Sequence, residues 1–204
     1  MGKCCYSKKE KNSGFTLVEF LIAMALALLI IGSLSSAFLS QRKTYAVQEQ
    51  ITAMTQDARA ALDMISREVK MAGYDPTGAG IVGVPYSATQ LQILMDINDD
   101  AGTGEGDGDT NDSNENIIYT YDSTNKQIDR NTGGSTQPLA ENIQSFTFQY
   151  YDTDGNTTMT AADIRQIEMT ITVRTSEPDP DYEQNSGYRT YTLISYITPR
   201  NLGL

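Results

Sequence analysis

The chain has 204 residues, with 15 Lys and Arg against 26 Asp and Glu and a formal net charge of −11. An acidic chain repels a phosphate backbone, so we expect no direct nucleic-acid binding. It contains no His, which excludes the Ser–His and Cys–His nucleophiles and removes the commonest zinc ligand. Its two cysteines, Cys4 and Cys5, are adjacent, which excludes a zinc site or disulfide framework built on spaced Cys pairs.

Residues 1–14 form a short basic segment that carries four Lys and a single Glu. Residues 20–41 follow as a run of 22 residues without an ionisable side chain, long enough as a helix to cross about 30 Å of hydrocarbon. Lysines before the run and acidic sequence after it place the N-terminus in the cytoplasm and the rest of the chain outside. A secretory signal peptide is the alternative, but its apolar region is typically about 7 to 15 residues long and ends at an A-x-A-like site.

Glu19 lies one residue before the uncharged run, among apolar neighbours. A carboxylate at the edge of a membrane is costly unless a cation pairs with it, and the nearest preceding Lys, Lys11, is eight residues upstream. Small residues at positions 32, 33, 35 and 36 interrupt the apolar run. They suit close packing against another helix rather than a permanent lipid anchor.

The sequence Gly14-Phe15-Thr16-Leu17-Val18-Glu19, followed by a long apolar helix, resembles the type III leader of type IV prepilins and their relatives. The resemblance rests on the short basic leader, the Gly before Phe15 and the lone Glu19. It implies that a membrane-embedded prepilin peptidase cuts between Gly14 and Phe15 and methylates the new amino group of Phe15. It also implies that Glu19 pairs with such an amino group, in a neighbouring subunit or in its own chain.

Cleavage would leave a mature chain of 190 residues with 11 basic and 25 acidic side chains, a net charge of −14. Apolar residues recur every three or four positions from Ile51 to Ala72, which predicts one helix from Phe15 to Ala72 that ends at Gly73. Its first half is apolar all round, and its amphipathic second half should pack on a sheet. The predicted segments are a cleaved leader at 1–14, a membrane-spanning polymerisation helix at 15–41, the amphipathic half-helix at 42–73 and a β-rich head at 74–204.

From residue 81 onward the apolar period changes to two, which indicates short β-strands separated by Gly, Asn and Asp clusters. Strands are predicted at 91–97, 117–122, 127–130, 143–151, 164–175 and 188–197. Two of them alternate cleanly, with Phe146, Phe148 and Tyr150 on one face of the first and Ile167, Met169, Ile171 and Val173 on one face of the second. We therefore expect an α+β fold with a long N-terminal helix packed on an antiparallel β-sheet, which is also the type IV pilin-like fold that the resemblance implies.

Later segments are similar to the PilW-type minor pilins. They are Gln48-Glu49-Gln50, the stretch from Ala60-Ala61-Leu62-Asp63 to Met71-Ala72-Gly73-Tyr74, Tyr151-Asp152-Thr153-Asp154-Gly155 and Arg200-Asn201-Leu202. Many pilins close a C-terminal loop with a disulfide, whereas this mature chain contains no Cys. Packing or a metal must therefore stiffen its C-terminal region.

Oxygen-bearing side chains between residues 152 and 163 match the spacing of a twelve-residue calcium loop. They are Asp152, Asp154, Asn156, Thr158, Thr160 and Asp163. Position 6 of the loop is Thr157 in place of Gly, and position 12 is Asp in place of Glu. Because the loop also joins strands rather than helices, a polar hairpin with an Asp–Gly turn is the favoured alternative.

A second acidic stretch, residues 96–115, is rich in Asp, Glu and Gly, and we expect it to be disordered without a ligand. Its candidate calcium ligands are Asp96, Asn98 and Asp100, or Asp107, Asp109 and Asn111, although no strict spacing closes a loop. Any bound Ca²⁺ would be structural, and no cofactor is required.

The resemblance implies a minor pilin, a low-copy subunit that primes or caps a type IV pilus. Its partners would be other major and minor pilins, contacted through the N-terminal helix, the prepilin peptidase and the inner-membrane assembly platform. The chain would sit in the inner membrane with its head in the periplasm before it reaches the pilus and the cell surface. The alternative is a minor pseudopilin of a type II secretion system, which shares the leader, the helix and calcium-dependent sheets.

A membrane-tethered enzyme is a third interpretation, in which paired carboxylates such as Asp152 and Asp154 would do acid–base work. These two side chains lie in a turn, without an apolar pocket that would raise the pKa of one of them. We therefore expect no enzymatic activity.

Overall fold

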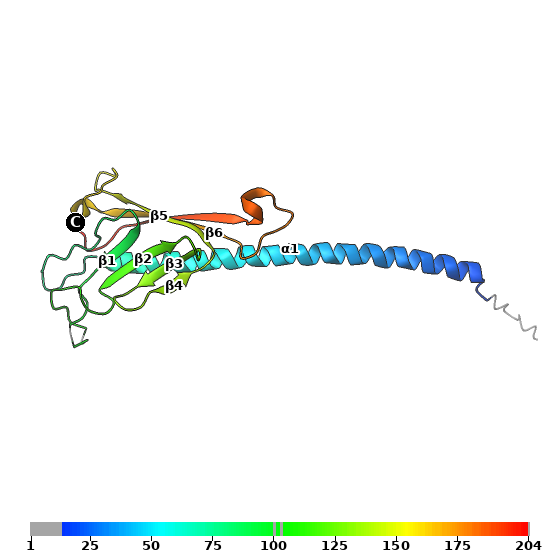
Figure 1. The fold of residues 1–204 in the computed structure, drawn as a ribbon, viewed down its shortest axis with the longest axis horizontal. Coiled ribbons are helices and arrows are strands. Elements are labelled where there is room, and N and C mark those ends of the chain that lie inside the picture. Colours follow the sequence, from blue (N-terminus) through cyan, green and yellow to red (C-terminus); the bar gives the residue numbers. More distant parts are fainter. Residues whose placement is uncertain (1–13, 100, 103, 204) are drawn as a thin grey trace, which may run out of the picture. The chain divides into compact units, whose positions relative to one another are not determined.

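The computed structural model describes residues 14–99, 101, 102 and 104–203, and the chain divides into two compact units, Met1–Ala46 and Val47–Leu204. Figure 1 shows a long helix followed by two sheets. In chain order the elements are α1 (Leu17–Met71), β1 (Gln90–Leu94), β2 (Asn116–Asp122), β3 (Gln127–Asn131), β4 (Gln137–Ala140), β5 (Ile143–Tyr151), the 3-10 helix η1 (Ala161–Asp163), β6 (Gln166–Arg174), the 3-10 helix η2 (Gln184–Gly187) and β7 (Thr190–Ile197).

The α1 helix confirms the predicted long helix and both of its predicted halves. Every described residue up to Ala46 is exposed, so the apolar side chains of this first half are not buried against the rest of the described chain. Beyond that point one face is buried, and its buried residues recur at helical spacing: Met54, Ala58, Ala61, Leu62, Ile65 and Val69. The helix ends at Met71, and Gly73 follows with a φ of 75°, the left-handed conformation that commonly terminates helices.

The strands form two antiparallel sheets, in the orders β1-β2-β3-β4 and β5-β6-β7. The helix-on-antiparallel-sheet architecture is therefore confirmed, with the strands divided between two sheets. The β4 strand was not predicted, because it has four residues and contains Pro138, which lacks the N–H that a central strand needs. Its position at the edge of the first sheet tolerates that Pro.

The two alternating rows predicted from the sequence supply much of the head's single core. The β6 residues Ile167, Met169, Ile171 and Val173 are buried together with Phe146 and Tyr150 of β5, and Phe148 is half-buried. Ile65 and Val69 of α1 belong to the same cluster and are fully buried. Burial of these side chains is the main force that holds the second half of α1 to the sheets.

A buried polar clamp joins α1 to the first sheet. The Tyr119 hydroxyl of β2 donates to Glu68 Oε2, and Arg130 of β3 donates from Nη2 to Glu68 Oε1 at 2.7 Å. Burial and the Glu68 carboxylate both raise the pKa of Tyr119 well above its usual range, so its hydroxyl remains protonated and able to donate. Glu68 thus finds two donors where a lone buried carboxylate would be costly.

The C-terminal segment is stiffened by its contacts with the end of α1. Asn201 donates from Nδ2 to the carbonyl oxygens of Met71 at 3.2 Å and Ala72 at 3.4 Å, at the end of the helix where carbonyl groups lack intrahelical donors. The Arg200 N–H donates to the Lys70 carbonyl at 3.3 Å, and Leu202 packs against the core. Packing or a metal was expected to stiffen this region in place of a disulfide, and the described residues provide packing.

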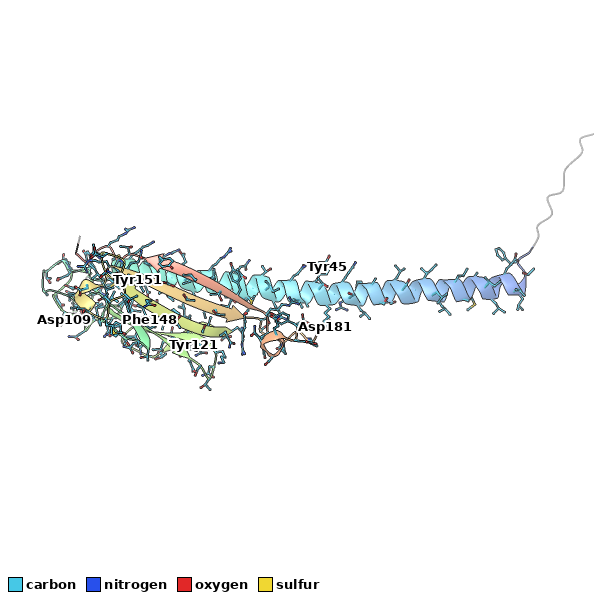
Figure 2. The ribbon with its side chains drawn as sticks, turned by 90° about the horizontal axis from the view of Figure 1, so that it is seen from above. Tyr45, Asp109, Tyr121, Phe148, Tyr151 and Asp181 are labelled. Atoms are coloured by element: carbon cyan, nitrogen blue, oxygen red, sulfur yellow. The ribbon has the colours of Figure 1, made fainter. Side chains whose placement is uncertain are left out.

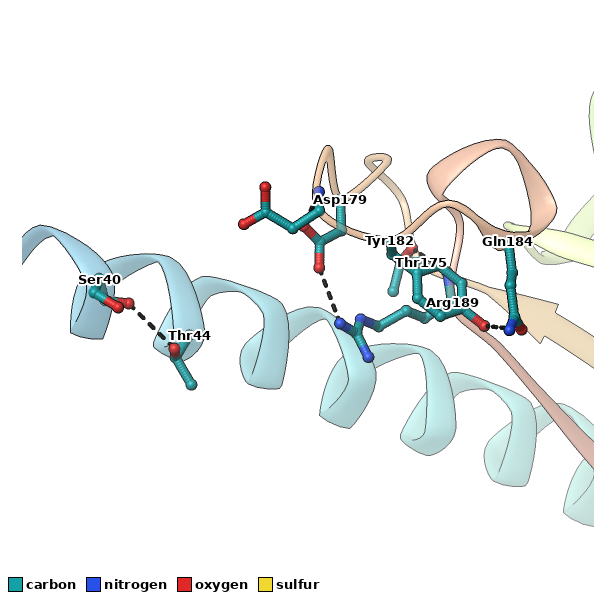
Figure 3. Close-up of polar contacts among 8 residues, drawn as sticks. Ser40, Thr44, Thr175, Asp179, Tyr182, Gln184 and Arg189 are labelled. Carbon is teal, nitrogen blue, oxygen red and sulfur yellow. Dashed lines mark hydrogen bonds and ion pairs between the residues drawn. The ribbon is translucent and has the colours of Figure 1, made fainter.

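The connection between β6 and β7, residues 175–189, is fastened by its own polar contacts (Figure 3). Arg189 donates to Asp179 at 3.0 Å and lies over the ring of Tyr182, with its guanidinium carbon 4.7 Å from the ring centre. The Tyr182 hydroxyl donates to Gln184 Oε1 at 3.2 Å. The Glu177 N–H donates to Gln50 Oε1 at 3.1 Å, which ties this connection to α1 within the head.

Candidate functional site

The predicted cleavage site lies immediately before α1, outside regular secondary structure. Gly14, Phe15 and Thr16 have no helical or strand assignment, and the Phe15 side chain is 86% exposed. A protease needs an accessible backbone outside regular structure, and all three residues are exposed. Residues 1–13 of the predicted leader lie outside the described residues.

Thr16 and Glu19 form a reciprocal capping box at the start of α1. The Thr16 N–H and hydroxyl donate to Glu19 Oε2 at 2.9 and 2.8 Å, and the Glu19 N–H donates to Thr16 Oγ1 at 3.3 Å. Two backbone donors that the first helical turn leaves open are thereby satisfied. The resemblance implied a role for Glu19 in assembly. Sequence reasoning missed the capping role of Thr16 and Glu19, although the Thr-x-x-Glu spacing predicts a capping box.

This geometry places Glu19 where a new amino group on Phe15 would form. Its carboxylate accepts from the amide that joins Phe15 to Thr16, so a free amine on Phe15 would lie one residue away along the chain. Both hydrogen bonds from Thr16 to the Glu19 carboxylate end on Oε2, and Oε1 takes part in neither. Pairing of Glu19 with its own or a neighbour's amine stays a prediction.

The apolar half of α1 is long and apolar enough to cross a membrane, and its apolar side chains are exposed. The hydroxyls of Ser33 and Ser36 donate to the carbonyls of Ile30 and Ser33 at 2.8 Å. The hydroxyls of Ser33 and Ser36 are therefore satisfied within the helix, so these two small residues permit close helix contact in an apolar setting.

The predicted calcium loop is a tight hairpin turn organised by Asp152. Its Oδ1 accepts from the N–H groups of Asp154 at 2.9 Å and Asn156 at 2.8 Å, and Gly155 takes a φ of 80°. The Thr158 N–H donates to the Tyr150 carbonyl at 3.0 Å, while Asp163 ends the separate helix η1. The hairpin thus uses the Asp152 carboxylate and the N–H groups of Asp154 and Asn156, and calcium binding stays a prediction.

The described residues of the second acidic stretch, 96–99, 101, 102 and 104–115, are tied by hydrogen bonds at both ends of the stretch, where disorder was expected. Asp96 and Glu115 at its two ends are fully buried. Asp96 accepts from the N–H groups of Asp107 and Gly108, both at 3.0 Å, and Glu115 accepts from those of Ile97 at 2.7 Å and Asn98 at 2.8 Å. Hydrogen bonds from backbone N–H groups therefore stabilise the Asp96 and Glu115 carboxylates, which offsets the repulsion expected to unfold the stretch.

The other candidate ligands in this stretch serve the same local order. Asp107 Oδ1 accepts from the Asp109 N–H at 3.2 Å, and Asp109 Oδ1 accepts from the Asn111 N–H at 2.8 Å. Asp109 lies in the loops beyond the strands, and Asp181 lies in the connection before β7 (Figure 2). Asp100 lies outside the described residues. Among those described, no three Asp, Glu or Cys side chains are grouped to hold a metal ion.

Asp75, which sequence reasoning missed, is the centre of a third loop. Its carboxylate accepts from the N–H groups of Gly78, Ala79, Gly80 and Ile81 at 2.7 to 3.2 Å. Desolvation raises the pKa of Asp75, but hydrogen bonds from Gly80, Ala79 and Ile81 outweigh it and lower that pKa to about 2. The signal was present as an Asp followed by Pro and two Gly, a composition typical of carboxylate-centred turns.

Comparison with known proteins finds the prokaryotic N-terminal methylation motif at residues 9–35. No curated protein matches the chain. A type IV-like pilin from Thermus thermophilus is similar in structure, with a TM-score of 0.43 and 11% sequence identity over 73% of this chain and 98% of that one.

Proposed function

We propose that this type IV prepilin-like protein is a minor pilin, a subunit that takes part in priming or capping a type IV pilus. The observation that carries the proposal is the methylation motif at residues 9–35, which covers the exposed Gly14–Phe15 bond, the Thr16–Glu19 capping box and the start of an apolar helix. A soluble head continues from the same helix, so one element serves both the membrane and the filament.

Processing would act on the part of the chain that the motif marks. A prepilin peptidase cuts between Gly14 and Phe15, removes the basic leader and methylates the amino group of Phe15. The charge removed with the leader is positive, and cleavage creates a new cation, the amine of Phe15, four residues before Glu19. Glu19 then holds that amine, in its own chain or a neighbour's, and the exposed apolar helix packs against other pilins.

We place the chain in the inner membrane, with the head in the periplasm until assembly carries it to the pilus. The net charge of the leader favours retention of residues 1–14 in the cytoplasm. The exposed apolar length of α1 supports partners that are themselves apolar helices, namely other major and minor pilins. The assembly platform and the peptidase are the membrane partners that this route requires.

A structural role is supported by the use of the acidic side chains. Asp75, Asp96, Glu115 and Asp152 each accept hydrogen bonds from backbone N–H groups that hold a loop in shape. Each of these carboxylates is thus engaged in holding the backbone of its own loop. We therefore propose no enzymatic activity for the head.

Intact mass spectrometry of the protein extracted from membranes tests the processing step. The expected mass is that of residues 15–204 plus one methyl group. A chain that keeps residues 1–14 in cells with an active prepilin peptidase would contradict the proposal. A Leu17→Ala variant is the control. Its substitution lies in α1, after the cleavage site, so this variant should insert in the membrane and be cut normally.

A further inference from the structure

The β7 strand lies at one edge of the second sheet, because the strand order is β5-β6-β7. None of its eight residues, 190–197, is Asp, Glu, Lys, Arg or Pro, in a chain of which 20% of the residues are charged. It pairs with β6 along its whole length without a register shift. Ile194 and Tyr196 are 56% and 60% exposed. A long, regular and uncharged edge strand of this kind is a template for the addition of another strand.

The register with β6 shows which backbone groups of β7 are open. Just before β7 the Thr175 N–H donates to the Arg189 carbonyl at 2.9 Å, and the register of β6 with β7 sets these two residues opposite each other. Bonded and non-bonded pairs alternate in an antiparallel ladder, so the odd-numbered residues of β7 bond to β6. The N–H and C=O groups at the free edge belong to Thr190, Thr192, Ile194 and Tyr196. Among the described residues, no backbone group of another segment bonds to them.

Both edges of the first sheet are protected against such an addition. At β1 the Leu94 N–H donates to the Gly83 carbonyl and the Leu94 carbonyl accepts from the Gly73 N–H, both at 2.8 Å, so neighbouring loops occupy that edge. At the other edge β4 has four residues and contains Pro138, which lacks an N–H. Covering loops, short strands and Pro are devices by which proteins block an open edge.

The far edge of the second sheet, formed by β5, is covered as well. The turn after β5 folds back, so that the Thr158 N–H donates to the Tyr150 carbonyl at 3.0 Å. The Tyr150 hydroxyl donates to the Ser87 carbonyl at 3.2 Å in the loop before β1, and this loop and the turn enclose a cavity of about 240 Å³ beside Tyr86. Among the sheet edges of the described chain, β7 alone lacks every one of these protective features.

The direction of β7 limits what can pair with it. Within the head, the connection before β7 meets α1 at Gln50, through the Glu177 N–H, and the segment after β7 meets α1 at Lys70, through the Arg200 N–H. The β7 strand, orange-red in Figure 1, therefore runs alongside the second half of α1 in the same direction. Two copies related by a two-fold axis would pair their β7 strands antiparallel and point their heads in opposite directions. Because both helices must lead back to one membrane, a symmetric dimer through β7 is excluded.

The size of the contact favours a partner that shares the membrane. Eight residues at about 3.4 Å each form an edge about 27 Å long, and a sheet is about 10 Å thick. A strand added there would bury on the order of 300 Å² on each side, whereas a stable complex buries roughly 800 Å² on each side. Such a contact is too small to hold a protein from solution. Anchoring in the same membrane raises the effective concentration of the partner, which makes a contact of this size sufficient.

We propose that β7 receives an antiparallel β-strand from the head of a different pilin-type subunit that is anchored in the same membrane. The strand carries uncharged β-branched or aromatic side chains opposite Ile194 and Tyr196, because a charge there would face no counter-charge on β7. Antiparallel pairing is the more stable arrangement per residue. The identity of the partner rests on the proposed function, and the contact adds an interface between heads to the packing of the apolar helices.

Site-specific photo-crosslinking in the native cells tests the proposal. The full-length chain carries p-benzoylphenylalanine in place of Tyr196, which is exposed at the free edge. Mass spectrometry should locate the cross-link in a strand of another protein that has the N-terminal methylation motif. Tyr74, a loop tyrosine with an exposure of 40%, is the matched control position and should give no cross-link to that strand. Absence of a cross-link from position 196, or a cross-link only to proteins without the motif, would overturn the proposal.

Three substitutions of Ile194 separate backbone pairing from other contacts. Ile194→Pro removes only an N–H that points to the free edge, and Ile194→Lys adds a charge there; both should abolish the cross-link. Ile194→Val keeps the N–H and should retain it. Near-ultraviolet circular dichroism shows whether each head is folded, and Ile194→Lys maintains the test if Pro prevents folding. Cross-linking that persists in a folded Pro or Lys variant would refute strand addition.

Pilus counts in the same strains separate this proposal from the assembly role. Loss of pili in a strain deleted for this chain, together with no cross-link from position 196, would overturn the β7 contact and leave the assembly role intact. Normal pili in the deletion strain, together with a cross-link to another pilin-type subunit that Ile194→Lys abolishes, would support the β7 contact and contradict the role in pilus assembly.

Discussion

Replacement of Glu68 by Ala tests how the second half of α1 is held to the first sheet. In the folded head, Glu68 accepts from the Tyr119 hydroxyl and from Arg130 Nη2 at 2.7 Å. Tyr119 is fully buried, and the side chains of Arg130 and Glu68 are 22% and 17% exposed. The substitution therefore leaves a buried hydroxyl and a largely buried guanidinium without their shared acceptor.

The cost follows from that burial. Removal of one member of a buried ion pair destabilises a protein by about 3–5 kcal/mol. Because this pair retains some contact with solvent, we expect the lower end, about 3 kcal/mol. For a domain of this size each kcal/mol lowers Tm by about 2–4 °C, so Tm should fall by about 6–12 °C. Glu68→Gln keeps an acceptor for Tyr119 and should lose about half as much.

The assay is thermal unfolding of the detergent-solubilised chain, followed by near-ultraviolet circular dichroism of its tyrosines. Asp63→Ala is the control on the same helix, because its ion pair with Arg67 is exposed, with side chains 64% and 77% accessible. Exposed pairs contribute about 0–1 kcal/mol, so Asp63→Ala should shift Tm by no more than about 4 °C. A loss in Glu68→Ala no larger than in Asp63→Ala would refute the clamp.

Three further outcomes are expected. Gly83→Ala should prevent folding of the head, because the added Cβ would lie 2.3 Å from the Gly73 nitrogen. Loss of the near-ultraviolet circular dichroism signal would show this. Gly134→Ala is the control and should fold normally, because there is open space around Gly134. The pKa of Asp75 is lowered from 3.8 to about 2, so the stabilisation of the folded head by this carboxylate is complete above about pH 4 and is lost as the pH falls toward 2. The Asp75→Asn variant should therefore show a smaller fall of Tm between about pH 4 and pH 2 than the wild type. An unchanged dependence of Tm on pH in this variant would contradict the loop geometry. If the 152–163 loop binds calcium, Ca²⁺ should raise Tm, and Asp154→Ala should abolish that increase. An identical Tm in Ca²⁺ and in a chelator would contradict calcium binding and favour the polar hairpin.

The long helix and most strands could be predicted because their apolar periods are local and unambiguous. The β5 strand begins and ends where the alternation of Phe146, Phe148 and Tyr150 indicated, and the buried face of α1 has the predicted spacing. The β4 strand escaped prediction because its partners and its edge position, not its own sequence, make Pro138 acceptable. Pairing of β4 with β3 therefore outweighs the low strand propensity of the Pro138 segment.

The loops could not be predicted because their order depends on contacts distant in sequence. The Asp96 carboxylate meets backbone donors eleven and twelve residues later, and Gly106 is required beside it, since a Cβ there would lie 2.4 Å from Asp96 Oδ1. Composition alone indicates repulsion in such a stretch and says nothing of these donors. The same holds for Asn201, which caps α1 from the far end of the chain.

The methylation motif could be recognised from contiguous residues, whereas the cavity beside Tyr86 could not. Gly14, Phe15 and Glu19 lie within six residues, and their meaning does not depend on the fold. The cavity takes its wall from three segments, around Tyr86, Phe148 and Thr158, that only the folded head brings together.

The assembly role is tested most directly by counting surface pili in the electron microscope. Three strains suffice: one deleted for this chain, one complemented with the wild-type copy, and one complemented with a Glu19→Ala copy. We expect pili to be lost in the deletion, restored by the wild-type copy and restored poorly by Glu19→Ala. Normal pilus numbers in the deletion strain would contradict the minor-pilin proposal and direct attention to the secreted proteins, where a pseudopilin would act.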